Sequence, residues 1–234
     1  MVEVIIGILT LTFMEIVLGI DNIIFIAIVA DKLPKELQSK ARRIGLMFAL
    51  IARIILLLSI TKIMELKDPL FSIPLPSHPI DMSWKDLILL AGGIFLLYKS
   101  ITEIREKAVG KEEVEKTAKA GNTLSKIIIQ IVLIDIVFSF DSILTAVALV
   151  SSVWIMIAAV IVSMAIMMFF SGPVADFINK QPTIQILALS FLILIGCMLT
   201  LEAFHVEVPK SYLYFAVGFS LIVEMINMRV RKNI

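Results

Sequence analysis

The sequence contains two similar stretches that lie 120 positions apart. Residues 14–24 read MEIVLGIDNII, and residues 134–144 read IDIVFSFDSIL. Four of the eleven positions are identical, and each stretch has an acid, five intervening residues, an Asp and then a small polar residue. Two apolar helices share isoleucine and valine easily by chance, but two pairs of acids at the same offset are a far more specific signal. We interpret the stretches as two copies of one repeated unit.

Both copies lie in apolar segments of a strongly apolar chain. Of the 234 residues, 59% are hydrophobic and 18% are charged, and the mean hydropathy is +1.01. Soluble domains are about 45–50% apolar and about 25% charged. The composition excludes a soluble enzyme, a disordered chain and a nucleic-acid binder, and it predicts an all-α polytopic transmembrane bundle. Apolar runs predict seven spans, at residues 4–30, 44–61, 86–99 (extended to 104), 126–150, 153–170, 184–201 and 212–228.

The two copies fall in the first and fourth spans. Because their starts are three spans apart, an odd number, the two copies cross the membrane in opposite directions, which defines an inverted repeat. We therefore expect one transmembrane domain over residues 1–234. It would contain a first repeat at 4–104, a charged cytoplasmic connector at 105–123, a second repeat at 124–201 and a seventh span at 212–228.

The basic residues predict the orientation in the membrane. Sixteen of the 21 lysines and arginines fall on one side: five in residues 31–43, seven in 99–126, one at 180 and three in 229–232. Four fall on the other side, and Arg53 lies inside a span. The positive-inside rule then places the N-terminus outside and the C-terminus in the cytoplasm, in the inner membrane of a prokaryote. No basic residue precedes Lys32, so we expect no cleavable signal peptide.

Several ionisable or polar residues lie within the predicted spans. The acids are Glu15, Asp21, Asp135, Asp141 and Glu224, while Arg53 is the single base, which leaves a formal charge of −4. Each acid costs about 2.5–3.5 kcal/mol at the centre of a helix that faces lipid. The acids are therefore expected to face inward and to be protonated or to bind cations, so the sequence favours a cation site over a purely structural polar network.

Helix geometry groups these residues further. At about 100° per residue, Glu15 and Asn22 share one helix face, as do Asp135 and Ser142, whereas Asp21 lies about 120° from Glu15. Unwinding at Gly19 or Ser139 would turn both acids of a copy toward one cavity. In the seventh span, Glu224 and Asn227 form an i,i+3 pair. Arg53 is either a charge partner that holds the acids apart or a participant in transport.

Three other features have simpler interpretations. Gly92 and Gly93 indicate a close approach between helices. His205 lies in an outside connector between Glu202 and Glu207, where a solvated histidine is expected and metal recruitment is the alternative. The single cysteine, Cys197, can form neither an intrachain disulfide nor a thiolate metal site.

The segments at residues 15–22, 135–142 and 223–227 resemble the signature segments of the TerC/Alx family of integral membrane proteins, and the resemblance covers essentially the whole chain. That family was first linked to tellurite resistance, is associated with manganese export across the bacterial cytoplasmic membrane, and belongs to the LysE-type exporter superfamily. The resemblance implies that the metal-handling positions are Glu15, Asp21, Asn22, Asp135, Asp141, Ser142, Glu224 and Asn227. The second copy has Asp for Glu, Ser for Gly and Ser for Asn, so the two halves need not bind metal equally.

The ligand chemistry predicts the kind of cation. Carboxylates, side-chain amides and backbone carbonyls suit Mn²⁺, Mg²⁺ and Ca²⁺, whereas the absence of thiolates and of histidines within the spans disfavours copper and zinc. We expect Mn²⁺ to enter from the cytoplasm, to be partly dehydrated by the central acids and to leave on the other side. Proton exchange on the carboxylates would reset the site.

The sequence leaves other functions open. Within transport they are a Ca²⁺/H⁺ or other divalent antiporter and an exporter of a small organic cation. An intramembrane hydrolase with an Asp21–Asp141 dyad is an enzymatic alternative, although the site has more oxygens than a dyad needs and we expect no enzyme. A membrane scaffold for the metalation of exported proteins is a third class. Expected partners are the lipid bilayer and the metal ion, with the secretion machinery or a second copy of the chain as further candidates.

Overall fold

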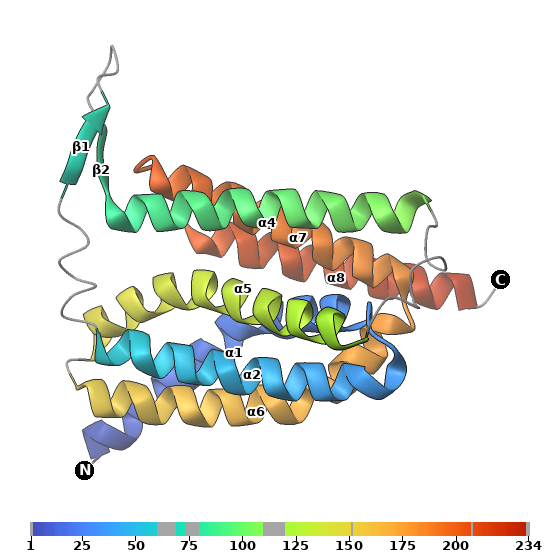
Figure 1. The fold of residues 1–234 in the computed structure, drawn as a ribbon, viewed down its shortest axis with the longest axis horizontal. Helices are drawn as coiled ribbons and strands as arrows, with labels where there is room; N and C mark the ends of the chain where they lie inside the picture. The colour runs from blue at the N-terminus through green and yellow to red at the C-terminus, as the bar shows by residue number, and fades with distance from the viewer. Residues whose placement is uncertain are drawn as a thin grey trace. The chain divides into compact units, whose positions relative to one another are not determined.

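The computed structural model describes residues 2–59, 69–73, 80–109, 120–150, 152–206 and 208–232 of the chain. The described helices are α1 (Val2–Ala30), α2 (Lys35–Leu58), α4 (Trp84–Val109), α5 (Ala120–Leu149), α6 (Val153–Asn179), α7 (Pro182–Ala203) and α8 (Lys210–Lys232) (Figure 1). Two short strands, β1 (Pro69–Ile73) and β2 (Ile80–Ser83), lie between α2 and α4 in the sequence.

A helix occupies each of the seven apolar ranges, which confirms the predicted helices, but several helices are longer than the apolar runs. The second helix already begins at Lys35 with the polar run KELQSKARR. The predicted end at residue 170 is too early, because α6 continues through Pro173 to Asn179. Proline is tolerated within membrane helices when neighbouring groups take over the freed backbone bonds. Hydropathy detects the apolar part of a helix and misses its polar ends.

Four of the described helical segments are long and apolar enough to cross a membrane: Trp84–Lys107, Val153–Asn179, Pro182–Ala203 and Ser211–Val230. A fifth is α1 when its two halves, Val4–Val17 and Asn22–Ala30, are taken as one span bent by 44°. Large apolar side chains are widely exposed on the helices, and Phe13, Trp154 and Phe215 each have more than 70% of their surface accessible. Such a surface suits lipid and not water.

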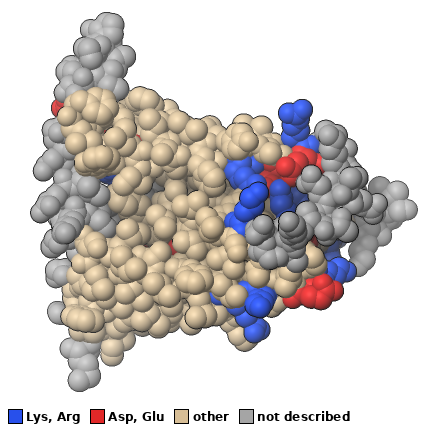
Figure 2. Space-filling model, in the orientation of Figure 1, with Lys and Arg blue, Asp and Glu red and all other residues tan. Residues whose placement is uncertain are grey.

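The helices form two compact units. Unit 1 comprises Met1–Glu65 and Glu113–Lys180, and unit 2 comprises Leu66–Glu112 and Gln181–Ile234. Each unit takes helices from both of the sequence ranges proposed as repeats. Most of the described residues on the face that Figure 2 shows are neither basic nor acidic.

Unit 1 is a four-helix group. Here α1 packs mainly against α6 and α2 mainly against α5, with further contacts between α1 and α5 and between α2 and α6. The C-terminal half of α1 is enclosed: Phe25, Ala27 and Val29 have no accessible surface. An apolar helix half that is buried all round needs other helices on every side, and the three neighbours of α1 provide them.

Unit 2 contains α4, α7, α8 and the β1–β2 hairpin. Its main helix contact is α4 against α7, where Gly93 and Gly196 allow the close approach predicted for the Gly92-Gly93 pair. The strands pair antiparallel, with Phe71 opposite Met82 and Ile73 opposite Ile80. This hairpin is an addition to the expected all-α fold. Pro69 stands at the first position of β1, where a strand tolerates proline.

Candidate functional site

The structure brings five of the predicted site residues together in unit 1. They are Glu15 and Asn22 on α1, Arg53 on α2, and Asp135 and Ser142 on α5, and all five are buried. The side chains of Asp21 and Asp141 lie outside the described part of the structure, although both positions are within helices. Glu224 and Asn227 lie on α8 in unit 2.

Arg53 is the centre of this site. Its Nε and Nη2 atoms donate to Oδ2 and Oδ1 of Asp135, each at 2.8 Å, and its Nη1 donates to Oε2 of Glu15 at 2.5 Å. The parallel pair of bonds to Asp135 is the bidentate geometry that a planar guanidinium makes with a carboxylate. The exposed fraction of the Arg53, Glu15 and Asp135 side chains is only 3%, 7% and 2%. Arg53 is therefore the charge partner of one acid from each copy of the repeated sequence.

Further polar groups surround Asp135. Asn22 Nδ2 donates to Asp135 Oδ1 at 3.3 Å, and Ser139 Oγ lies 3.4 Å from Asp135 Oδ2 and also donates to the backbone carbonyl of Asp135. Ser142 Oγ donates to the carbonyl of Ser139 at 3.2 Å. These hydroxyl bonds to the preceding turn are the usual arrangement for serine within a helix. The Asn22 and Ser142 positions, equivalent in the two copies, thus differ: Asn22 reaches the acid, while Ser142 bonds to its own helix.

The charges in this cluster do not cancel. Its described side chains carry two carboxylates and one guanidinium, which leaves one negative charge in a buried position. Removing charges from water is costly, and a buried ion pair recovers the cost only when its hydrogen bonds are well satisfied. Both oxygens of Asp135 are bonded to Arg53, whereas Glu15 is bonded to Arg53 through Oε2. Among the described residues, the cluster therefore has one more carboxylate than it has cationic side chains.

Two buried acceptors on α1 have no hydrogen-bond partner among the residues that the structure describes. They are Oδ1 of Asn22 and Oγ1 of Thr12. Leaving such a group unsatisfied costs about 1–3 kcal/mol. Amide and hydroxyl oxygens are also among the ligands that hard divalent cations accept.

The helix bend in α1 lies at the predicted break. The two halves of α1 are inclined by 44° across residues 18–21, yet the backbone stays helical from Val2 to Ala30. A methyl group added at Gly19 would come within 2.4 Å of the Met167 sulfur on α6. The unwinding that the sequence permits at Gly19 is thus a bend in a continuous helix, and the glycine makes room for a methionine side chain.

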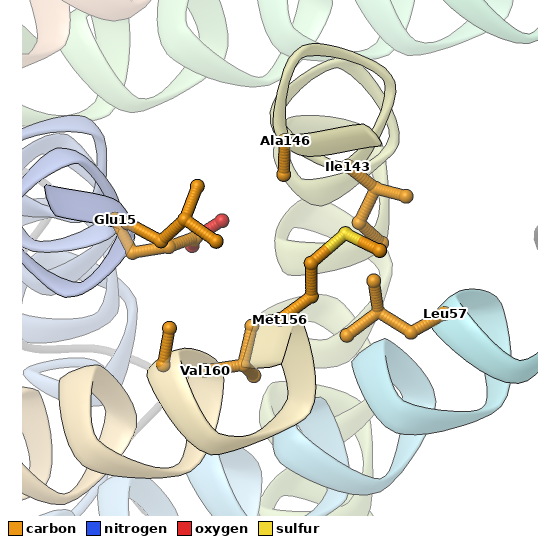
Figure 3. Close-up of a pocket in the computed structure, with 8 residues that line it drawn as sticks. Glu15, Leu57, Ile143, Ala146, Met156 and Val160 are labelled. Atoms are coloured by element: carbon orange, nitrogen blue, oxygen red, sulfur yellow. The ribbon is translucent and has the colours of Figure 1, made fainter. Parts of the chain in front are cut away.

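A small pocket opens beside Glu15. Its other described lining residues are Leu11, Leu57, Ile143, Ala146, Met156, Ala159 and Val160, so Glu15 is the one charged group among the lining residues that the structure describes (Figure 3). Figure 3 shows the Glu15 side chain directed from α1 toward the space between α5 and α6. Most of the lining residues come from the N-terminal part of α1 and α6 and the C-terminal part of α2 and α5. The pocket therefore lies toward the end of unit 1 where the chain enters α1.

No group of three or more histidine, cysteine, aspartate or glutamate side chains forms a ready-made metal site among the described residues. Glu15 and Asp135 are instead held by Arg53. In unit 2, Asn227 Nδ2 lies 3.5 Å from Glu224 Oε2, and Glu224 Oε1 is buried without a partner there. The predicted i,i+3 pair on α8 is therefore present as a local contact.

A polar layer between α4 and α7 was not predicted from the sequence. Glu103 has 1% of its surface exposed and pairs with Lys99 at 2.8 Å, and Lys107 donates to Gln185 at 2.6 Å. The predicted span ended at residue 99 or 104, so these residues were assigned to the membrane boundary or the connector. The helical period would have indicated their burial, because Glu103 and Lys107 continue the helix face on which Gly93 packs against α7.

His205 is solvated, as expected, with 51% of its side chain exposed, and it also contacts a buried carboxylate. Its Nε2 lies 3.2 Å from Oδ2 of Asp86, which accepts bonds from the backbone N–H and hydroxyl of Ser83, the last residue of β2. His205 has a φ of 60° and follows the end of α7. Glu202, which the metal-recruiting alternative would need, pairs with Lys85 at 3.2 Å.

Together, the fold and the site define a polytopic helical membrane protein in which an arginine is buried between two carboxylates. The chain belongs to the integral membrane protein TerC family, whose model matches residues 2–234. It is 48% identical over 225 residues to the UPF0053 inner membrane protein YgdQ of Escherichia coli, covering 96% of this chain and 92% of YgdQ.

Two further relatives give a consistent picture. A UPF0053 protein of Haemophilus influenzae is 45% identical over 227 residues, which is 97% of this chain and 94% of that protein. The UPF0053 inner membrane protein YoaE of Escherichia coli is also 45% identical over 227 residues, but these cover 43% of its length. No solved structure matches the chain.

Proposed function

We propose that this protein exports a divalent metal cation, with Mn²⁺ as the leading candidate, through the buried site of unit 1. The observation that carries the proposal is the Glu15–Arg53–Asp135 cluster with the unpartnered Asn22 Oδ1 beside it. A purely structural ion pair needs neither an excess negative charge nor a vacant acceptor. Ionisable residues within membrane helices mark ion pathways more often than structural contacts.

The arrangement of helices supports the inverted repeat on which this transporter model rests. In unit 1, α1 and α5 run in opposite directions, as do α2 and α6, and in unit 2 α4 runs opposite to α7 (Figure 1). In the proposed repeat, helices α1, α2 and α4 correspond to α5, α6 and α7. Replacing each helix by its counterpart converts the α1–α6 contact into the α5–α2 contact and converts the α4–α7 contact into itself. These are the main contacts of the two units. We therefore propose seven spans, with three in each repeat, and a site shared by both repeats as in many secondary transporters.

The oxygen ligands support a hard divalent cation. Carboxylate and amide oxygens suit Mn²⁺, Mg²⁺ and Ca²⁺, and the choice of Mn²⁺ follows from the family resemblance. In the proposed cycle the metal enters from the cytoplasm, exchanges part of its water for protein oxygens and leaves on the outer side, with the proton gradient as the energy source. This is transport and involves no enzymatic step.

The proposed location is the inner membrane of a bacterium. YgdQ and YoaE are named inner membrane proteins, and the sixteen-to-four distribution of basic residues supports an outside N-terminus and a cytoplasmic C-terminus. In this orientation the Glu15 pocket faces the outer side of the membrane. The metal would then leave the site through the apolar wall that contains Leu11, Leu57 and Met156.

The decisive experiment is flux through purified protein in liposomes. We expect movement of Mn²⁺ that increases with an imposed pH gradient, less movement of Ca²⁺, and none of Zn²⁺. Glu36→Gln, a change at an exposed charge on α2, serves as the control and should transport normally. If none of the three metals crosses faster than in empty liposomes, the proposal is wrong. Co-purification with the secretion machinery in that case would favour the scaffold function instead.

A further inference from the structure

We propose that Arg53 is a tethered cation that takes the metal's place between Glu15 and Asp135 when the transporter is empty, so that metal binding must displace it. This inference rests on the proposed function and specifies how its site is regulated. It concerns Arg53, which the sequence alone left open between holding the acids apart and taking part in transport.

The first argument is the shared use of ligands. Arg53 engages both oxygens of Asp135 and one oxygen of Glu15. A metal ion that bridged the two acids through these oxygens would lie about 2 Å from each of them. Its position would overlap the guanidinium nitrogens, which now lie 2.5–2.8 Å from those oxygens. The metal and Arg53 therefore cannot occupy the site together.

The second argument is charge. An arginine side chain stays protonated inside proteins, so it cannot make way for a cation by losing a proton. Next to a bound divalent ion it would be a like charge in a site with almost no access to solvent, where repulsion is strong. Arg53 must therefore move away from the acids as the metal arrives.

The third argument concerns the empty protein. With Arg53 in place, the two acids and the arginine carry one net negative charge in total, and Asp135 is fully hydrogen-bonded. Without it, two bare carboxylates would be buried, unless protons neutralised them. Arg53 thus allows the empty transporter to reorient without protons on Glu15 and Asp135, and proton coupling would act at other acids.

The test compares Arg53→Gln with wild type in two assays on purified protein. The first measures Mn²⁺ binding at alkaline pH, where we expect Arg53→Gln to bind at least about tenfold more tightly, because the competing state is gone. The second separates net Mn²⁺ efflux from exchange of Mn²⁺ across liposomes that contain Mn²⁺ on both sides. We expect exchange to persist while net efflux is lost, because only net efflux requires the empty protein to reorient.

Two variants control the comparison. Arg42→Gln removes the other buried arginine of α2 without touching Glu15 or Asp135, and it should change neither the affinity nor the ratio of exchange to net efflux. Arg53→Lys keeps the charge but loses the bidentate bonds. It should bind Mn²⁺ more tightly than wild type and retain part of the net efflux, and it provides the test if Arg53→Gln does not fold.

Weaker or unchanged Mn²⁺ binding in the Arg53 variants, with exchange and efflux falling together, would overturn the inference while leaving the transport function intact. Wild-type protein that neither binds nor moves metal would overturn the proposed function first, and this inference with it. The wild-type measurement therefore distinguishes the two failures.

Discussion

Gly93 of α4 and Gly196 of α7 face each other with their backbones in contact. A methyl group added at Gly93 would lie 2.8 Å from the carbonyl oxygen of Gly196, and one added at Gly196 would lie 3.0 Å from the carbonyl oxygen of Gly93. Small residues allow membrane helices to approach this closely, and the packing then depends on the absence of a side chain.

We predict that Gly93→Ala destabilises unit 2 by about 1–3 kcal/mol, because backbone atoms of α7 cannot move aside as a flexible side chain can. Thermal unfolding in detergent measures the effect. Gly218→Ala on α8 is the matched control, since nothing lies within 4 Å of the added methyl group there. Equal unfolding temperatures for the two variants would contradict the close contact.

We predict that Asp135→Asn destabilises unit 1 by about 3–5 kcal/mol, because it leaves the buried Arg53 without its main partner. Glu15→Gln should cost less, because Glu15 makes one bond to Arg53 and Asp135 makes two. Combining Asp135→Asn with Arg53→Gln should cost less than the sum of the single changes. Strictly additive unfolding free energies would show that the pair is not coupled.

We predict that Asn22→Leu changes the unfolding free energy by less than about 1 kcal/mol, because the loss of the 3.3 Å bond from Asn22 Nδ2 to Asp135 is offset by the removal of an unsatisfied buried acceptor. Mn²⁺ flux should nevertheless fall about tenfold or more, as expected for the loss of a group that holds the ion. Ser142→Ala tests the equivalent position of the second copy, whose hydroxyl is bonded to its own helix, and flux should stay near wild type. Flux retained in Asn22→Leu would remove Asn22 from the site.

We predict that Gly19→Ala reduces stability by about 1 kcal/mol or more, because the added methyl group overlaps the Met167 sulfur. Met167→Ala should restore stability in the double variant by making space on α6. Gly7→Ala, where the nearest atom is 3.5 Å away, should be tolerated. Failure of Met167→Ala to rescue would mean that the glycine serves the helix bend and not the packing.

We predict that Asp21→Asn and Asp141→Asn each abolish manganese tolerance of cells while the protein still inserts into the membrane. The prediction follows from their equivalent positions in the two copies of the repeated sequence. Growth on manganese, with membrane-fraction immunoblots as the control for insertion, provides the measurement. Full tolerance in both variants would exclude a role for these acids.

The helices were predictable because their apolar runs are long, and the equivalent positions of Glu15 and Asp135 in the two copies predicted that both acids lie within the helical bundle. Hydropathy could not place the helix ends, since α6 runs through Pro173 and the first turns of α2 are polar. Neither could it find the β1–β2 hairpin, because isolated strands of four or five residues depend on contacts and not on composition.

The residue types of the cluster were predictable from the sequence, but the ion pairs that they form were not. Five acids and one arginine indicate a cation site, and Arg53 could have paired with any of them. The choice of Glu15 and Asp135 depends on how α2 packs against α5 and on how α1 lies beside both, which are contacts between distant parts of the chain. The polar layer around Glu103 was not predicted for a related reason. Glu103 is buried because α4 packs against α7, and hydropathy carries no information about that contact.

Unit 1 is assembled from two separate parts of the chain, so its helices become available for packing at different times during synthesis. Asp135 follows Arg53 by 82 residues, which a ribosome adding about 5–20 residues per second needs roughly 4–16 s to make. During that interval Glu15 is the single carboxylate of the final trio that Arg53 can meet. The complete charge cluster therefore forms late in biogenesis, after α5 has been synthesised and has packed against α1 and α2.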